Sequence, residues 1–112
     1  MSIEVLNIIP RKYAENSQTG QYTSDNAKTV IDKFTVTNVT ANNLDLSVNL
    51  VANGDTASNA NLVLNARTIA AGETYTCPEL VGQSLEAGGF ISTLASAATS
   101  LVISATGRVI TS

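Results

Sequence analysis

Residue types that perform acid–base or nucleophilic chemistry are scarce in this chain. It has no histidine and a single cysteine, Cys77, which excludes Ser-His-Asp and Cys-His systems and most zinc sites. Its seven glycines form neither a G-x-G-x-x-G pattern nor a phosphate-binding loop. We therefore predict no catalytic residues, no cofactor, no metal site and no enzymatic activity. Some carboxylates could still converge in space, although their spacing gives no sign of it: Asp45, Asp55, Glu73, Glu79 and Glu86.

Two short segments allow a second interpretation. The segment 53–59 (NGDTASN) offers several oxygen atoms to a calcium ion, but it lacks the regular acidic spacing of a calcium-binding loop. A plain polar turn is the favoured interpretation. Cys77, just before Pro78, could be a reactive thiol. A small buried residue at the end of a strand is the favoured role for it.

Charge and hydropathy argue against two classes of partner. Six Lys and Arg against nine Asp and Glu give a net charge of −3, which disfavours binding to nucleic acid. The first residues lack the basic and apolar regions of a secretory signal, and no apolar run approaches the ~20 residues of a membrane helix. We expect no nucleic-acid partner and no membrane partner.

The segment Thr29–Val51 shows the strongest hydrophobic pattern. Two runs in which apolar and polar residues alternate, 30–37 and 44–50, flank the polar loop 38–43. A period of two is typical of a half-buried strand, so the segment predicts an antiparallel hairpin with one apolar face. We expect the core to contain the apolar residues of these runs and of a later alternating run: Phe34, Val36, Leu44, Leu46, Val48, Leu50, Leu101 and Ile103.

Further short alternating segments follow at intervals of 8–12 residues, separated by turn residues such as those of Asn53-Gly54-Asp55. Seven or eight strands with no convincing helix result. The pattern predicts an all-β fold, an antiparallel β-sandwich of jelly-roll or immunoglobulin-like type.

Residues 1–27 are mostly polar and have neither period beyond a short run at the start. We predict an extended N-terminal arm over residues 1–27 and a β-sandwich domain over residues 28–112. The arm is expected to order against a neighbouring copy by adding a strand to its sheet. Its tyrosines could stack on a sugar or a base, but packing on a neighbouring subunit is favoured. The proposed interface residues are Ile3, Val5, Ile8, Ile9, Tyr13 and Tyr22.

Three groups of segments carry a resemblance. QYTS at residues 21–24 precedes KTVIDKFTVTN at residues 28–38, and IAAGETY occupies residues 69–75. LVGQSLEAG at residues 80–88 is followed by LVISATGR at residues 101–108. Together they resemble small virion proteins of tailed bacteriophages, in which a Tyr-Thr pair precedes an apolar strand ending in TVTN. One departure is Ser24-Asp25-Asn26-Ala27, where a proline-glycine turn is more usual.

The resemblance implies a β-sandwich structural component of the virion, made in the cytoplasm of the host bacterium. We expect a capsid decoration or cement protein that forms a homo-oligomer, a trimer among the options, and contacts the major capsid protein or another virion protein. A head–tail connector or tail accessory protein is an alternative. A receptor- or glycan-binding module is a third, but such a site favours exposed aromatic residues, and the chain has only five.

Overall fold

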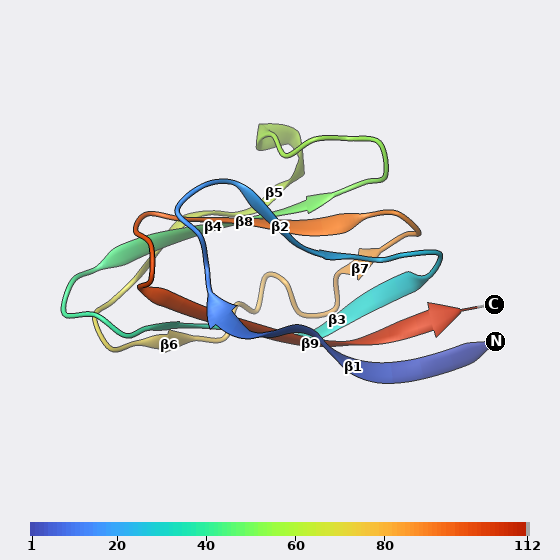
Figure 1. Cartoon of the computed structure of the whole chain (residues 1–112), viewed down its shortest axis with the longest axis horizontal. Coiled ribbons are helices and arrows are strands. Elements are labelled where there is room, and N and C mark those ends of the chain that lie inside the picture. The colour runs from blue at the N-terminus through green and yellow to red at the C-terminus, as the bar shows by residue number, and fades with distance from the viewer. Residues whose placement is uncertain (112) are drawn as a thin grey trace.

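The computed structural model describes residues 1–111, which form two antiparallel sheets packed face to face (Figure 1). The predicted all-β sandwich is confirmed. The described residues hold nine strands rather than seven or eight, because residues 1–27 contribute two of them. The elements are β1 (Ser2–Tyr13), β2 (Thr19–Thr23), β3 (Lys28–Asn38), β4 (Leu44–Val51), the 3₁₀ turn η1 (Asn59–Asn61), β5 (Leu62–Ile69), β6 (Thr74–Tyr75), β7 (Ser84–Leu85), β8 (Phe90–Ala95) and β9 (Leu101–Thr111).

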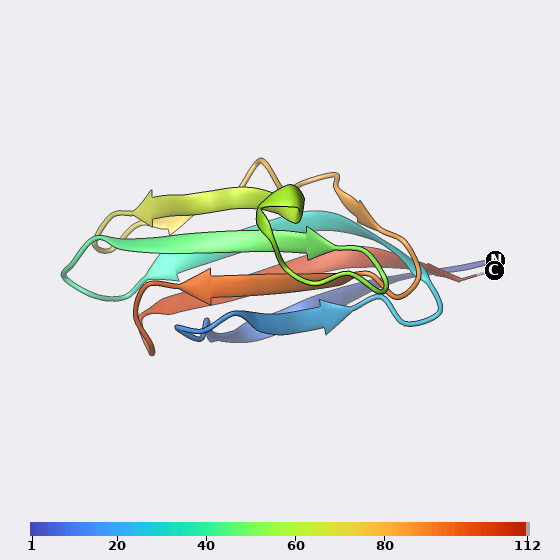
Figure 2. The same cartoon turned by 90° about the horizontal axis from the view of Figure 1, so that it is seen from above.

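The strand order defines a jelly roll. Sheet A has the order β1-β9-β3-β6, with β7 also paired to β3, and sheet B has the order β2-β8-β4-β5. The first strand thus pairs with the last, β2 with β8, β3 with β6 and β7, and β4 with β5. This is the pairing of one long hairpin rolled around the sandwich. Figure 2 shows the two sheets from above, with the start of β1 and the end of β9 side by side at one end.

The predicted core residues lie between the two sheets. Six of the eight are fully buried: Phe34, Val36, Leu46, Val48, Leu101 and Ile103. Leu44 and Leu50 are partly buried and pack against this cluster. The alternation along each strand therefore identified the inward face correctly, because successive side chains leave opposite faces of a pleated strand.

The predicted hairpin over Thr29–Val51 is wrong. The strand β3 lies in sheet A and β4 in sheet B, so the loop between them crosses from one sheet to the other. Phe34 and Leu46 lie on the inner faces of opposite sheets rather than side by side on one. Alternation reports which face of a strand is apolar, and both arrangements bury that face equally well.

The N-terminal segment is extended as predicted, but it is not an arm separate from the sandwich, and the boundary at residue 27 does not hold. The strand β1 pairs with β9 from Ser2 to Tyr13, and β2 pairs with β8. Ile8 and Ile9 were predicted interface residues, yet both are buried in the core of their own chain. A register shift between Leu6 and Ile9 breaks the alternation, so the consecutive residues Ile8 and Ile9 both point inward. Ser112, at the end of the predicted domain, lies outside the described residues.

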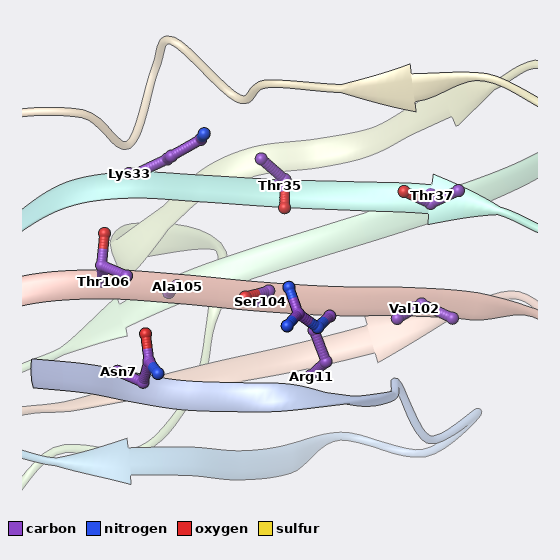
Figure 3. A pocket seen from close by; sticks show the side chains of 9 residues that line it. All are labelled: Asn7, Arg11, Lys33, Thr35, Thr37, Val102, Ser104, Ala105 and Thr106. Atoms are coloured by element: carbon purple, nitrogen blue, oxygen red, sulfur yellow. The ribbon is translucent and has the colours of Figure 1, made fainter.

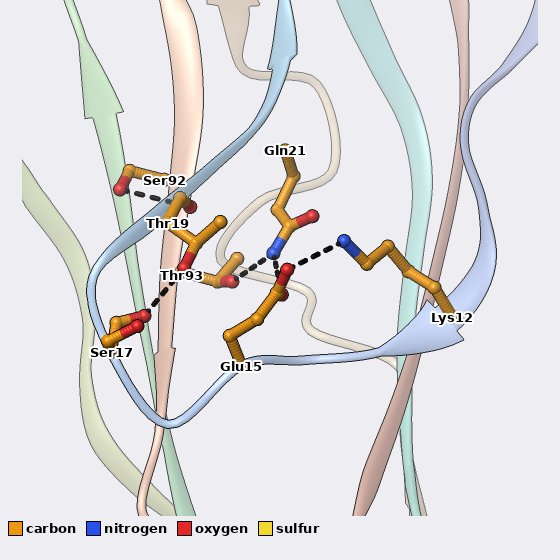
Figure 4. A network of polar contacts seen from close by, with 7 residues as sticks. All are labelled: Lys12, Glu15, Ser17, Thr19, Gln21, Ser92 and Thr93. Carbon is orange, nitrogen blue, oxygen red and sulfur yellow. Dashed lines mark hydrogen bonds and ion pairs between the residues drawn. The ribbon is translucent and has the colours of Figure 1, made fainter. Parts of the chain in front are cut away.

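Polar contacts hold the connection between β1 and β2 against β8 (Figure 4). The Gln21 side-chain amide donates to Glu15 at 2.8 Å and to the Thr93 hydroxyl at 2.9 Å. Lys12 donates to the other Glu15 oxygen at 3.0 Å. The Ala95 backbone N–H donates to the Glu15 carbonyl oxygen at 3.0 Å. The segment is ordered by hydrogen bonds more than by apolar burial, which a count of apolar residues does not reveal.

Candidate interaction surface

The outer face of sheet A collects three of the predicted interface residues. Residues directly opposite in an antiparallel pair share a face, and Ile3, Val5 and Tyr13 lie opposite Ile110, Arg108 and Val102 of β9. These β9 residues alternate with the buried Leu101 and Ile103 and therefore point outward. The exposed fractions of Ile3, Val5 and Tyr13 are 55%, 74% and 47%. We call this surface the sheet A face, and it consists of Ile3, Val5, Arg11, Tyr13, Lys33 and the outward residues of β3 and β9.

A shallow depression of about 310 Å³ lies on the sheet A face (Figure 3). Its floor is formed by short side chains on the central strands β3 and β9, and Arg11 of β1 reaches over it. Lys33 lies on its other side, on β3. Hydroxyl groups and two cations thus line an open groove: Asn7, Arg11, Lys33, Thr35, Thr37, Val102, Ser104, Ala105 and Thr106.

Arg11 and Lys33 are the two Lys or Arg side chains for which residues 1–111 provide neither an ion pair nor an aromatic partner. Lys12, Lys28 and Arg108 form ion pairs with Glu15, Glu86 and Asp32, and Arg67 stacks over the Tyr75 ring at 4.2 Å. Charge composition does not single out either residue, because basic and acidic side chains are equal in number over residues 1–33. Which cations remain unpaired depends on where the fold places the carboxylates.

Tyr22 does not join the sheet A face. Its hydroxyl lies 2.9 Å from the Thr29 hydroxyl, and its ring packs against the core. Thr29 in turn hydrogen-bonds to the Ser24 hydroxyl at 2.7 Å, which also donates to the Ala27 carbonyl oxygen. The ring of Tyr22 therefore anchors the turn between β2 and β3 within its own chain.

The outer face of sheet B differs from the sheet A face in its chemistry. The Asn49 amide donates to the Ser58 carbonyl oxygen and to the Asn61 side chain, and Gln18 donates to Ser92. A depression of about 310 Å³ lies beside this network under the loop that precedes η1. No aromatic side chain lines it in the part of the chain described, and an aromatic platform is what sugar binding favours. Its lining residues are Gln18, Ser47, Asn49, Ala57, Ser58, Asn59, Leu62, Asn65 and Leu94.

The fold bears on the two places that allowed a second interpretation, Cys77 and the segment 53–59. Cys77 is buried, and its burial raises the pKa of the thiol to about 12, so the thiolate that a nucleophile needs is scarce at neutral pH. In the segment 53–59, the carbonyl oxygens of Thr56 and Ser58 accept hydrogen bonds from Asn61 and Asn49.

Within residues 1–111, no three acidic, cysteine or histidine side chains gather closely enough to hold a metal ion. The same residues include no helix long and apolar enough to cross a membrane.

Hydrogen bonds lower the pKa of two carboxyl groups below the ordinary value of 4.5. The hydrogen bond from Gln21 has the largest effect on the pKa of Glu15, and the hydrogen bond from Lys12 lowers it further. The Tyr75 hydroxyl, 2.8 Å from both oxygens of Glu79, lowers the pKa of that carboxyl. A carboxyl with a lowered pKa in the folded state adds stability above its unfolded pKa, and this stability is lost as the pH falls through the folded pKa. The Glu79 side chain is exposed and that of Glu15 is 40% exposed, so solvent keeps the contribution small.

We therefore expect the free energy of unfolding to decrease as the pH falls below about 4.5. In the double variant Glu15→Gln/Glu79→Gln, the free energy of unfolding should fall less steeply with decreasing pH than in the wild type. Urea unfolding at a series of acidic pH values measures this dependence. Glu4→Gln is the matched control, since residues 1–111 provide no hydrogen-bond donor to the Glu4 side chain. An equally shallow dependence for the control and the double variant would contradict this prediction.

Comparison with known proteins gave no match: no family model, no curated protein and no solved structure is significantly similar to this chain.

Proposed function

We propose that the protein is a non-enzymatic structural protein of a tailed-phage virion, a capsid decoration or cement protein that stabilises the shell through subunit-bridging contacts. The observation that carries this proposal is the sheet A face, which combines exposed apolar residues with two cations that have no ion-pair partner within residues 1–111, on a chain of net charge −3. Exposed apolar groups rimmed by polar ones are typical of protein–protein interaction sites. The resemblance of residues 21–111 to virion proteins supports the same function.

The distribution of charge favours the sheet A face as the side that contacts the capsid. The carboxylates outnumber the basic residues by three in the chain as a whole, while Arg11 and Lys33 lie on the sheet A face without a carboxylate partner within residues 1–111. An acidic surface on the major capsid protein would therefore attract this face and repel the remainder of the molecule. The contact should weaken as salt is added, because both cations are exposed to solvent.

The first test is the number of copies per virion, measured by quantitative mass spectrometry of purified particles of the phage that encodes the chain. Hundreds of copies are expected for a decoration protein. A dozen or fewer would favour the alternative, a head–tail connector or tail accessory protein. Absence from the particle would overturn the proposed function.

The second test concerns the surface. The double variant Arg11→Gln/Lys33→Gln should bind particles that lack the protein roughly tenfold more weakly than the wild type, measured by co-sedimentation. Lys12→Gln/Lys28→Gln is the matched control, since it removes two charges that are already in ion pairs. An equal loss for both double variants would mean that only net charge matters and that the sheet A face is not the contact.

A further inference from the structure

The outer edge of β1 is unpaired over its first half. The strand lies at one end of the sheet A order, with β9 on one side, and no other strand of residues 1–111 pairs with it. From Ser2 opposite Thr111 to Leu6 opposite Gly107 the ladder is regular, and register shifts begin only after Leu6. Backbone N–H and C=O groups along a regular edge form a template for another strand.

The two halves of this edge differ in how they are protected. Pro10, which has no N–H, and the cations Arg11 and Lys12 lie in the second half, beside the register shifts. These are the features by which proteins block edge-to-edge pairing. The first half carries exposed Ile3, Val5 and Leu6, with Glu4 as the one charged side chain. An unprotected edge of this kind is suited to a partner strand.

We propose that the partner is the same edge of a second copy, so that β1 pairs antiparallel with β1 across a two-fold axis perpendicular to the sheet. The inference rests on the proposed function and deepens it by naming the surface between copies. Two-fold pairing occupies the β1 edges of both copies at once and closes the assembly. It also turns the sheet A faces of both copies in the same direction, because a perpendicular axis does not exchange the faces of a sheet. The joined pair would then contact a particle through two adjacent sheet A faces, and linked contacts bind more tightly than single ones.

The side chains select one register. With Val5 opposite Val5, Ile3 of each copy lies opposite Asn7 of the other, and Glu4 lies opposite Leu6. Moving the axis to Glu4 would place two carboxylates directly opposite each other, which is unfavourable. Moving it to Leu6 would extend the pairing into Ile8 and Ile9, where the strand leaves its regular register. Val5 on the axis joins the apolar side chains of both sheet A faces into one patch.

The register predicts a specific cross-link. Facing residues of an antiparallel pair have Cα atoms about 4.5–5.5 Å apart, a separation that a disulfide spans. Val5→Cys should therefore form a disulfide-linked dimer under mild oxidation. The control is Ile3→Cys, also exposed on the same face; its two copies would lie about 14 Å apart at ~3.4 Å per residue and should stay unlinked. The wild type controls for the buried Cys77. Equal cross-linking of the two variants, or none in Val5→Cys, would overturn the register.

Sedimentation of the purified protein tests the dimer itself. The wild type should show a monomer–dimer equilibrium, and Val5→Lys, which sets two ammonium groups against each other on the axis, should raise the dissociation constant at least tenfold. Val39→Lys is the matched control, because Val39 is 54% exposed and follows β3 at the end of sheet A opposite the termini. A monomer at all concentrations, a trimer, or equal behaviour of the two variants would contradict the inference. A dimer that fails to bind particles would instead contradict the proposed function alone.

Discussion

Leu46→Ala is expected to lower the free energy of unfolding by about 2–5 kcal/mol. Leu46 lies in the middle of β4, is fully buried and belongs to the core between the sheets. Its neighbours come from both sheets, so the cavity left by the truncation cannot be filled without moving strands on either side. Equilibrium unfolding in urea measures the change.

Leu94→Ala is the matched control, since the same atoms are removed from a residue of β8 that is 37% exposed on the outer face of sheet B. We expect a loss of about 1 kcal/mol or less, because the side chain is already partly hydrated. A loss for Leu94→Ala as large as that for Leu46→Ala would contradict the assignment of the inner and outer faces of sheet B, because Leu94 lies opposite Ser47 on the outer face.

Asn38→Ala is expected to lower the free energy of unfolding by roughly 2–4 kcal/mol, since each buried polar group left without a partner costs about 1–3 kcal/mol. The buried Asn38 amide donates to the carbonyl oxygens of Asn42 at 2.7 Å and Ile69 at 2.9 Å. The side-chain oxygen Oδ1 of Asn38 accepts hydrogen bonds from the backbone N–H and the hydroxyl of Thr40. One side chain thus holds the crossing from β3 to β4 against the end of β5.

Asn42→Ala removes the same group from the same loop and serves as the control. The contact between Asn38 and Asn42 uses the backbone carbonyl oxygen of Asn42, which the substitution leaves in place, so we expect a change within about 0.5 kcal/mol. Thermal unfolding of both variants gives the comparison. A small effect of Asn38→Ala would show that water replaces the lost partners and that the crossing does not depend on this side chain.

Local side-chain periodicity is enough to predict which residues face the core wherever a strand is regular. Val48, Leu101 and Ile103 are inward because the covalent geometry of an extended chain has a period of two, which needs no knowledge of the neighbouring strand. The same period places Ser47 on the outer face. There the Ser47 hydroxyl accepts a hydrogen bond from the backbone N–H of Ala66 at 2.8 Å, a contact that depends on the tertiary structure. Ala66 has a positive φ of 46° at a register shift of β5, a feature that no alternation reveals.

Which strands pair, and which side chains have no partner within residues 1–111, depends on contacts between residues far apart in the sequence. Alternation is a local property, whereas strand pairing joins residues as distant as Ser2 and Thr111, so the sequence left β3 and β4 equally compatible with one sheet or two. Ile8 and Ile9 are both buried because a register shift against β9 interrupts the period. Arg11 and Lys33 meet on one face because β1 and β3 flank β9 in sheet A. The candidate surface therefore depends on long-range pairing, which local side-chain periodicity does not encode.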